Sequence, residues 1–311
     1  MVGLTHAFAT IEMKDAEMAD FEVNEGSDPA AGDGLWHSSW RTLRHHPAGM
    51  IGLIGFGLLL VVVLLAPLLA PADPTALDIA HALQAPGKAH LFGTDDLGRD
   101  VFSRVLWGGR ESLRVALIAI VVAALGGITL GLTSGYFGGA VDGITMRVVD
   151  VFLAFPTILL LLSIVAALGP SLGTVLIAVG ISFIPNVARF VRSNVLVVRN
   201  SEYVTAARVL GADDRYIMGT QILPNILAPL IVYSTIGLGS AIMLTAGLSY
   251  LGLGAQPPSP EWGAMLNYGR NYLRDAWWMS VFPGLAMFAA VLFINLLGDG
   301  LRDALDPKLR V

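Results

Sequence analysis

The sequence predicts an all-α integral membrane protein with six transmembrane helices. Composition and the distribution of charge predict this class. Of the 311 residues, 55% are hydrophobic and 14% are charged, whereas soluble domains carry about 25% charged residues. The hydrophobic residues also gather into six long segments without charge, and a membrane-spanning helix needs about 20 apolar residues. The polar stretches between these segments then hold the positions where other molecules can bind.

The six segments contain no Asp, Glu, Lys, Arg or His. We expect spans at Met50–Ala70, Val115–Phe137, Val151–Leu168, Leu172–Ala188, Ile222–Leu251 and Ser280–Gly298. Ionisable residues inside the membrane usually mark proton relays or ion-coupled transport. Their absence from these segments argues against a carrier that is driven by an ion gradient.

Small residues and prolines indicate how the spans pack and bend. Four glycines follow one another at intervals of four residues: Gly127, Gly131, Gly135 and Gly139. This spacing allows the backbones of two helices to approach closely, so a packing role is expected. Four prolines in or next to spans are candidate kinks: Pro185, Pro224, Pro229 and Pro283.

The region before the first span has two parts. Residues 1–34 hold eight acidic residues and one lysine. They lack the apolar core of a signal peptide and are interpreted as a disordered acidic cytoplasmic tail. Residues 35–75 contain an interfacial helix and the first span. Trp36 and Trp40 repeat there at helical spacing opposite Arg41 and Arg44, although a plain linker remains the alternative.

Charge asymmetry orients the spans. The loop 189–215 carries five arginines against three acids, whereas 71–111 carries four bases against six acids. Basic loops stay in the cytoplasm, so 189–215 is expected inside, with both termini, and 76–111 forms an external loop. Residues 112–298 then form a transmembrane domain of five helices with a loop at 189–224, and residues 299–311 form a cytoplasmic tail.

The stretch Glu202–Pro224, EYVTAARVLGADDRYIMGTQILP, is a compact polar insert between two spans. Ala206 and Ala207 favour a helix with a surface that a partner can approach. Gly211 can end that helix with a positive φ, and Pro224 suits the first turn of the next span. Glu202 near the helix start suits the helix dipole. We expect a soluble, ATP-hydrolysing partner to dock here.

The sequence offers no catalytic constellation. Its one Gly-Lys pair, Gly87-Lys88, lacks the upstream glycine and the following Ser or Thr of a phosphate-binding loop. GxSxG and HExxH motifs are missing, and there is no cysteine. The chain is therefore expected to be non-catalytic and to bind no cofactor or metal, so that a partner must supply the energy for any work.

Four stretches carry a resemblance to a known family. They are HLFGTDDLGRDVFSR (90–104), GGAVDGITMRVVDVFLAFP (138–156), the stretch 202–224, and NLLGDGLRDALDPKLR (295–310). In this order they resemble the permease subunits of the dipeptide/oligopeptide (peptide/nickel) ABC importers, in particular the second of the two homologous permeases. The resemblance runs from about Trp40 to the C-terminus.

The resemblance implies a type I ABC importer permease fold with a cytoplasmic coupling helix, in the bacterial plasma (inner) membrane. It also implies a set of partners: a second homologous permease, two ABC ATPase subunits that bind ATP and Mg²⁺, an extracytoplasmic substrate-binding protein, a peptide substrate and the lipid bilayer. Nucleic acid is not among them. The chain itself would couple ATP hydrolysis by these partners to uptake.

The family signature places the contact with the ATPase on particular residues. The matching positions here are Glu202, Ala206, Ala207, Gly211, Leu223 and Pro224. The acidic residue of the signature corresponds to Thr205, and this chain has Glu202 one helical turn earlier. The sequence leaves open which side chain makes the polar contact with the ATPase.

Other motif residues have less defined roles. On the external side, Asp95, Asp96, Arg99 and Asp100 are expected either to contact the binding protein or to form a charge network that caps and fixes a loop. Glu261 and Trp262 are candidates for contact with the binding protein or the second permease. On the cytoplasmic side, Asp142, Arg147 and Asp150 belong to a second motif.

Two alternatives stay open at this stage. One is the same architecture with nickel or short oligosaccharides as cargo, which the resemblance also implies for relatives. The other is a stand-alone secondary transporter. The family places selectivity largely in the binding protein, so the sequence of the permease does not decide the cargo.

Overall fold

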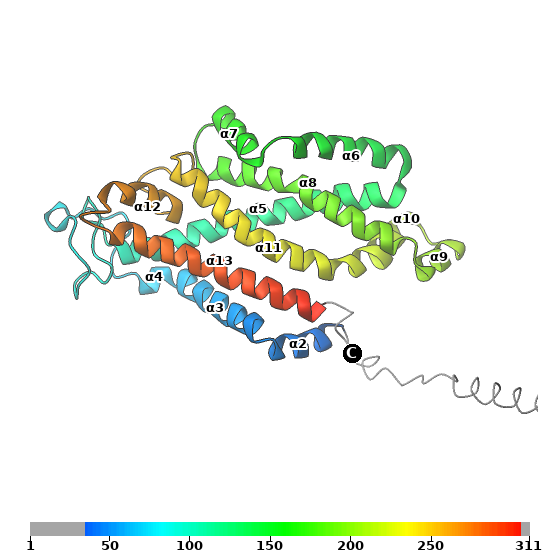
Figure 1. Ribbon diagram of the computed structural model, residues 1–311, viewed down its shortest axis with the longest axis horizontal. Coiled ribbons are helices and arrows are strands. Elements are labelled where there is room, and N and C mark those ends of the chain that lie inside the picture. Colours follow the sequence, from blue (N-terminus) through cyan, green and yellow to red (C-terminus); the bar gives the residue numbers. More distant parts are fainter. Residues whose placement is uncertain (1–34, 306–311) are drawn as a thin grey trace, which may run out of the picture. The chain divides into compact units, whose positions relative to one another are not determined.

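The computed structural model describes residues 35–305 and divides the chain into two units, residues 1–42 and 43–311 (Figure 1). The predicted acidic tail at 1–34 lies outside the described residues. Helix α2 (Leu35–His45) confirms the predicted helix before the first span, and Trp40, Arg41 and Arg44 are exposed on it. The described residues otherwise form helices and loops. They contain one isolated antiparallel β-bridge, between Thr94 and Asp100.

Within residues 35–305, five helices are long and apolar enough to cross a membrane. They are α3 (Pro47–Leu64), α5 (Val101–Phe137), α8 (Leu172–Val198), α11 (Leu223–Tyr250) and α13 (Trp278–Leu305). The shorter elements are α4 (Ala66–Leu69), η1 (Ile79–His81), α6 (Gly139–Ala154), α7 (Thr157–Leu168), α9 (Glu202–Val209), α10 (Asp214–Tyr216), η2 (Ile217–Ile222), α12 (Trp262–Gly269) and η3 (Arg270–Tyr272). Because α10 and the π-helical η2 run directly into α11, the chain is helical from Asp214 to Tyr250.

The predicted third span is not one straight helix. Helices α6 and α7 pass the membrane criterion only as a pair, and they are bent by 89° at the break between them. Phe155 lies at this break in extended conformation, followed by Pro156. A proline lacks the N–H that a helix needs and disfavours helical backbone in the residue before it. Each of the other five predicted spans overlaps one long helix, namely α3, α5, α8, α11 or α13.

Helix α5 begins much earlier than the predicted second span. It starts at Val101 and has 37 residues, a length of about 55 Å, whereas the hydrocarbon core of a bilayer is about 30 Å thick. Its first turns carry Arg104, Arg110, Glu111 and Arg114 and therefore lie beyond the apolar region. The predicted external loop 76–111 is thus helical from Val101 onward.

Glycines bring α5 and α8 into backbone contact. A Cβ atom on Gly127 would lie 2.4 Å from Val187, and one on Gly131 would lie 2.5 Å from the carbonyl oxygen of Ala188. A Cβ atom on Gly135 would lie 2.9 Å from Val195. The packing role predicted for the glycine series is confirmed for these three residues. Gly139 lies beyond the end of α5, and a Cβ there would meet nothing within 4 Å.

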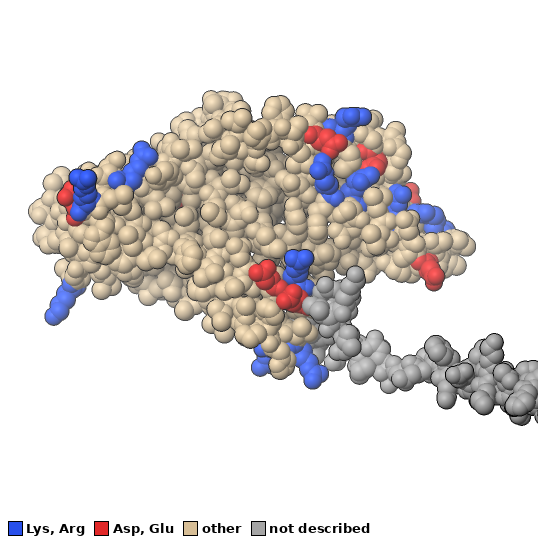
Figure 2. Space-filling view, in the orientation of Figure 1, with Lys and Arg blue, Asp and Glu red and all other residues tan. Residues whose placement is uncertain are grey.

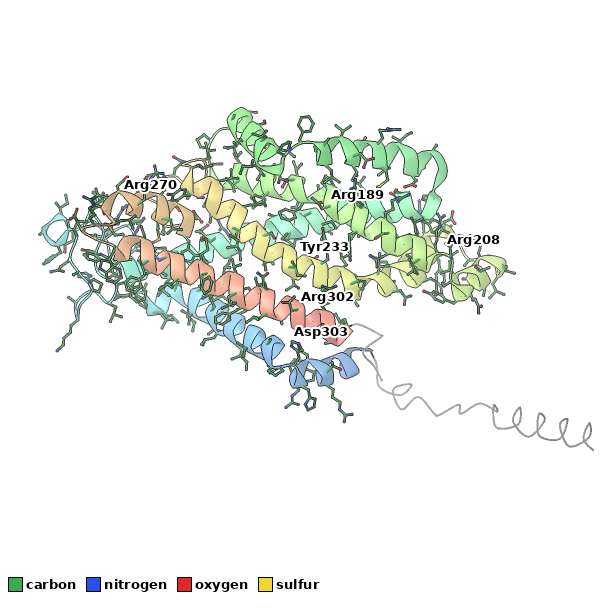
Figure 3. All side chains as sticks on the ribbon, viewed as in Figure 1. Arg189, Arg208, Tyr233, Arg270, Arg302 and Asp303 are labelled. Carbon is green, nitrogen blue, oxygen red and sulfur yellow. The ribbon has the colours of Figure 1, made fainter. Side chains whose placement is uncertain are left out.

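Charged side chains gather toward the ends of the long helices, and the face shown in Figure 2 is free of them in between. Arg189 and Arg208 lie near the end of the molecule that carries α9 (Figure 3). A second cluster of buried apolar residues lies at this end, and it includes Val195, Val204, Ile217 and Ile222. Because Val204 belongs to α9, this cluster packs α9 against the rest of the protein.

We predict that Gly131→Ala destabilises the protein by about 1–3 kcal/mol, because the added methyl group overlaps the backbone of α8. Gly143→Ala is the matched control, since a Cβ at this helical position meets nothing within 4 Å. The control should leave stability unchanged or raise it by up to about 1 kcal/mol. Thermal unfolding in detergent micelles measures both, and equal melting temperatures would contradict the close contact.

Candidate functional site

Helix α9 forms the predicted short helix between two spans, with the predicted boundaries. Glu202 occupies its first turn, where a carboxylate interacts favourably with the helix dipole. Its C-terminus closes in a Schellman motif: the Gly211 amide bonds to the Arg208 carbonyl and the Ala212 amide bonds to the Ala207 carbonyl. Gly211 has φ +84°, which confirms the predicted need for glycine. The chain therefore turns sharply after two helical turns.

One buried side chain attaches α9 to the spans. Val204 is fully buried and belongs to the same apolar cluster as Ile217 and Ile222, which are also fully buried. The outward face of α9 is apolar as well, since Val209 and Leu210 are 82% and 85% exposed. Large aliphatic side chains with that exposure in a loop between spans indicate a surface that a partner covers.

Two shallow hollows flank the exposed face of α9. One is lined by Tyr203, Ala206, Ala207, Leu210, Gly211 and Tyr216, together with Ala212 and Gln221. The other is lined by Asn200, Glu202, Thr205, Ala206, Val209 and Leu210. Ala206 and Leu210 belong to both hollows, so they form the ridge between them. The structure thus brings together Glu202, Ala206, Ala207 and Gly211.

The two remaining signature residues lie apart from these hollows. Leu223 and Pro224 form the first turn of α11, where proline is well tolerated. Leu223 is partly buried against the apolar cluster, and Pro224 is exposed. The two residues therefore begin the span that follows the loop and do not line the hollows.

The structure distinguishes the two candidate polar residues, Glu202 and Thr205. The Thr205 hydroxyl donates to the Ser201 carbonyl oxygen at 3.1 Å, so its proton is used within the helix. The exposed Glu202 carboxylate makes no hydrogen bond or ion pair with any residue in the described range 35–305. Of the two, only Glu202 has its full hydrogen-bonding capacity available to a partner.

Tyr136, which no motif in the sequence indicates, links α5 to the loop that contains α9. Tyr136, 6% exposed, donates its hydroxyl proton to Asp214 at 2.5 Å, and the Arg208 guanidinium lies 5.7 Å from its ring centroid. Arg199 also donates to the carbonyl oxygen of Gly135 at 2.6 Å. The contact between Tyr136 and Asp214 joins positions 78 residues apart, and no local pattern in the sequence signals it.

The motif predicted to be cytoplasmic connects α6 to α8. Asp142 receives two hydrogen bonds from the Arg192 guanidinium, each of 2.5 Å, and one from the Ser134 hydroxyl. Asp150 pairs with Arg189 at 2.6 Å in an exposed position. The third motif residue, Arg147, is exposed and has no ion pair within residues 35–305. Two of the three residues therefore hold the first half of the broken span against α8.

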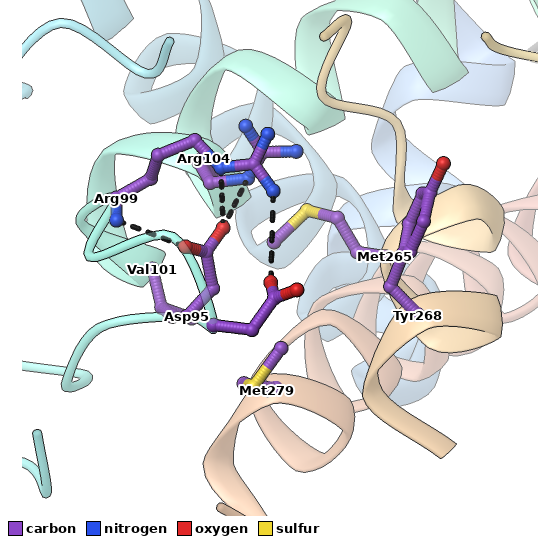
Figure 4. Close-up of a pocket in the computed structure, with 8 residues that line it drawn as sticks. Asp95, Arg99, Val101, Arg104, Met265, Tyr268 and Met279 are labelled. Carbon is purple, nitrogen blue, oxygen red and sulfur yellow. Dashed lines mark hydrogen bonds and ion pairs between the residues drawn. The ribbon is translucent and has the colours of Figure 1, made fainter. Parts of the chain in front are cut away.

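The charge network predicted for the external loop exists and is largely buried. The Asp95 carboxylate accepts from the Arg99 side chain at 2.6 Å and lies 3.6 Å from Arg104 (Figure 4). Asp100 caps α5 by accepting from the Ser103 amide at 2.8 Å. These contacts correspond to the capping and loop-fixing alternative.

Asp96 is the most exposed of the four external residues, with a side chain that is 28% exposed. It accepts from the Tyr272 hydroxyl at 3.4 Å, and its negative charge raises the pKa of Tyr272. Contact between this network and a binding protein stays a prediction.

Glu261 and Trp262 are fully buried within the chain, so neither presents its side chain to a partner in this structure. Glu261 caps α12 by accepting from the Ala264 amide at 2.9 Å, and it accepts from the Ser112 hydroxyl at 2.8 Å. The Trp262 indole donates to the Val105 carbonyl oxygen at 2.9 Å and packs on Gly109, where a Cβ would lie 2.6 Å from the ring. Both residues fasten α12 to the outer part of α5.

Comparison with family models decides the class of this protein. Residues 127–311 match the model of the binding-protein-dependent transport system inner membrane component. Residues 34–86 match the N-terminal transmembrane domain of oligopeptide transport permease C. The chain belongs to the family of binding-protein-dependent transport system inner membrane components. It is a non-catalytic, multi-pass permease subunit of an ABC importer, and the ATPase activity of such importers belongs to partner subunits.

Curated relatives in the family match nearly the whole chain. The dipeptide transport system permease protein DppC of Alkalihalophilus pseudofirmus is 44% identical over 275 residues, which cover 88% of this chain and 90% of the relative. The glutathione transport system permease protein GsiD of Pectobacterium atrosepticum is 46% identical over 88% of this chain and 92% of its own. The probable D,D-dipeptide transport system permease protein DdpC of Escherichia coli is 44% identical over 86% and 89%.

A solved structure shows the same fold. The inward-facing methionine ABC transporter MetNI contains a chain that aligns with a TM-score of 0.53 at 19% identity, covering 65% of this chain and 96% of that chain. This likeness confirms the predicted type I permease fold.

We predict that Glu261→Ala destabilises this permease by about 1–3 kcal/mol, because the change removes the cap of α12 and leaves the buried Ser112 hydroxyl without its acceptor. Asp275→Ala is the control, since Asp275 is an exposed acid on the same loop. Thermal unfolding reports the loss. If Glu261→Ala instead kept full stability and lost affinity for the binding protein, the structural role would be wrong.

Proposed function

We propose that this permease and a second homologous permease form the translocation pathway of an ATP-driven importer of dipeptides and oligopeptides. The observation that carries the proposal is the face of α9, which presents Val209 and Leu210 to solvent between two hollows. In the proposed mechanism α9 is the coupling helix: it inserts its ridge into a cleft of one ATPase subunit. ATP binds to the partner ATPases with Mg²⁺, and this chain binds neither.

The contacts around α9 support transmission of movement. Displacement of the loop by a closing ATPase dimer pulls on Tyr136 through Asp214 and on the apolar cluster through Val204. Tyr136 lies in the last turn of α5, and α5 contacts α8 through the glycines. Because packed helices move as rigid bodies, the spans respond together, and the pathway opens alternately to each side of the membrane.

The excess of basic residues in 189–215 supports a cytoplasmic location for α9 and, with it, for both termini. The segment 71–100 and helix α12 then lie outside, where a substrate-binding protein delivers the cargo. Peptide cargo is supported by the names of the relatives, which transport dipeptides, D,D-dipeptides and glutathione. Nickel or short oligosaccharides remain the alternative cargo for the same architecture. A stand-alone secondary transporter does not fit a family whose transport depends on a binding protein.

We predict that Ala206→Trp abolishes uptake, because the indole occupies the ridge between both hollows and blocks docking. Stimulation of ATP hydrolysis by the substrate-loaded binding protein should be lost with it, while membrane insertion is retained. Gly143→Trp is the control, since it adds the same bulk at an open position on α6. Uptake assays and ATPase assays in proteoliposomes check this, and normal uptake by Ala206→Trp would refute the coupling role of α9.

We further predict that Glu202→Gln weakens ATPase binding about 10-fold or less, corresponding to the loss of one charge-assisted hydrogen bond. Thr205→Val should have almost no effect, because the Thr205 hydroxyl already bonds within the helix. Titration of the purified permease pair with ATPase subunits measures both affinities. A larger loss for Thr205→Val than for Glu202→Gln would assign the polar contact to Thr205 instead.

A further inference from the structure

Uncharged polar side chains in the middle of the spans fall into two groups. In the first group, a hydroxyl or amide bonds to a carbonyl oxygen about one turn earlier in its own helix. Members of this group are Thr129, Thr133, Ser163, Ser193, Asn194 and Thr235. Such residues are satisfied internally and can face lipid at little cost.

The second group has no such bonds. Asn186, Tyr233, Ser240 and Asn295 make no side-chain hydrogen bond to any residue in the part of the chain that the structure describes, and the same holds for Ser234, next to Tyr233, and for the buried Thr245. Asn186, Ser240 and Asn295 are exposed, and Tyr233 is partly exposed. We call these four residues the mid-span polar band. An unpaired amide or hydroxyl in hydrocarbon is costly, so the band is expected to face something other than lipid.

The four residues lie on α11 and on the two helices α8 and α13, each of which contacts α11. Tyr233 and Ser240 are seven residues apart on α11, which places them on one face about 10 Å apart. Phe190 of α8 stacks on the Tyr233 ring with centroids 4.3 Å apart, and Asn186 lies one turn from Phe190. On α13, the Asn295 side chain lies 2.8 Å from the Cβ position of Gly239, next to Ser240. Figure 3 shows Tyr233 near the middle of α11.

The exposed face of α11 continues through the band. Ile236, Ser240, Met243 and Tyr250 repeat at helical spacing and are all exposed, so this side of α11 is not covered by the chain itself. A contact between two helices follows a stripe along one axis. The polar band instead extends across three helices, as do the polar groups that line channels.

From this arrangement we infer that the mid-span polar band lines the translocation pathway and forms transient hydrogen bonds with the backbone of the peptide in transit. The inference rests on the proposed function and adds the part of the site that meets the cargo. Asn, Ser and Tyr side chains both donate and accept hydrogen bonds, which matches the amide groups that every peptide shares. Because the band is uncharged, it holds the peptide weakly enough for release.

The absence of cysteine from the sequence makes a direct accessibility test possible. Ser240→Cys and Asn295→Cys are introduced singly into the assembled transporter in proteoliposomes and treated with 2-aminoethyl methanethiosulfonate, which requires water to reach the thiol. Leu125→Cys is the matched control: it lies within one turn of Gly127, which packs on Val187 at the level of the band, and its side chain is 63% exposed on α5.

Both band variants should be labelled several-fold faster than Leu125→Cys. Trialanine delivered by its binding protein in the presence of ATP should change the rate of labelling at Ser240→Cys. Rates equal to that of Leu125→Cys would overturn the inference, because the band would then face lipid or a closed contact with the second permease. This test does not require Ala206→Trp to behave as predicted, so it fails or succeeds independently of the coupling role.

The hydrogen-bonding role is tested with the triple variant Tyr233→Phe/Ser240→Ala/Asn295→Leu. Trialanine uptake per ATP hydrolysed should fall about fivefold or more, because each lost hydrogen bond contributes a factor of this order. Stimulation of ATP hydrolysis by the binding protein should persist. The control Thr129→Val/Thr133→Val/Ser163→Ala removes hydroxyls that bond within their own helices and should leave uptake unchanged. Unchanged uptake in the triple variant, or a parallel loss of ATP hydrolysis, would overturn the assignment.

Discussion

The backbone contact between α5 and α8 holds this permease together. Gly127, Gly131 and Gly135 have no Cβ, so the two helices approach until the side chains of one touch the backbone of the other. Inside a membrane, helices gain little from the hydrophobic effect against each other, and close packing becomes the main source of their affinity. The position of α8 then fixes the two parts that follow from it: the coupling loop after its C-terminus, and α6, which Arg192 binds through Asp142.

Helix α5 connects the two ends of the membrane domain. Its N-terminal end is capped by Asp100 and fastened to α12 by Glu261 and Trp262. Its C-terminal end places Tyr136 against Asp214, just after α9. One rigid helix of 37 residues therefore lies between the side where a binding protein would deliver cargo and the side where an ATPase would act. Such an arrangement suits a subunit that converts movement at one surface into opening at the other.

The sequence predicts the location of most spans and the ends of α9, because these follow from local rules. Hydropathy marks the apolar segments, and Gly211 ends α9 since it takes a positive φ. The break at Pro156 and the outer turns of α5 were not predicted, because a search for charge-free segments sees neither a bend nor a helix that continues beyond the membrane. Tyr136 and the mid-span polar band depend on contacts or exposure across several helices, which no local pattern contains. Glu261 and Trp262 were expected at a surface, and only their tertiary contacts show them to be interior.

The central claim is that the exposed ridge of α9 binds an ATPase subunit. The most direct test is to place the photoreactive residue p-benzoylphenylalanine at position 210 in the assembled transporter, where the native Leu210 is 85% exposed, and to irradiate. If the ridge docks there, irradiation gives a covalent adduct between this permease and the ATPase subunit, whereas the same residue at position 143 on α6 gives none. An adduct with lipid alone, or no adduct at position 210 while transport continues, would contradict it.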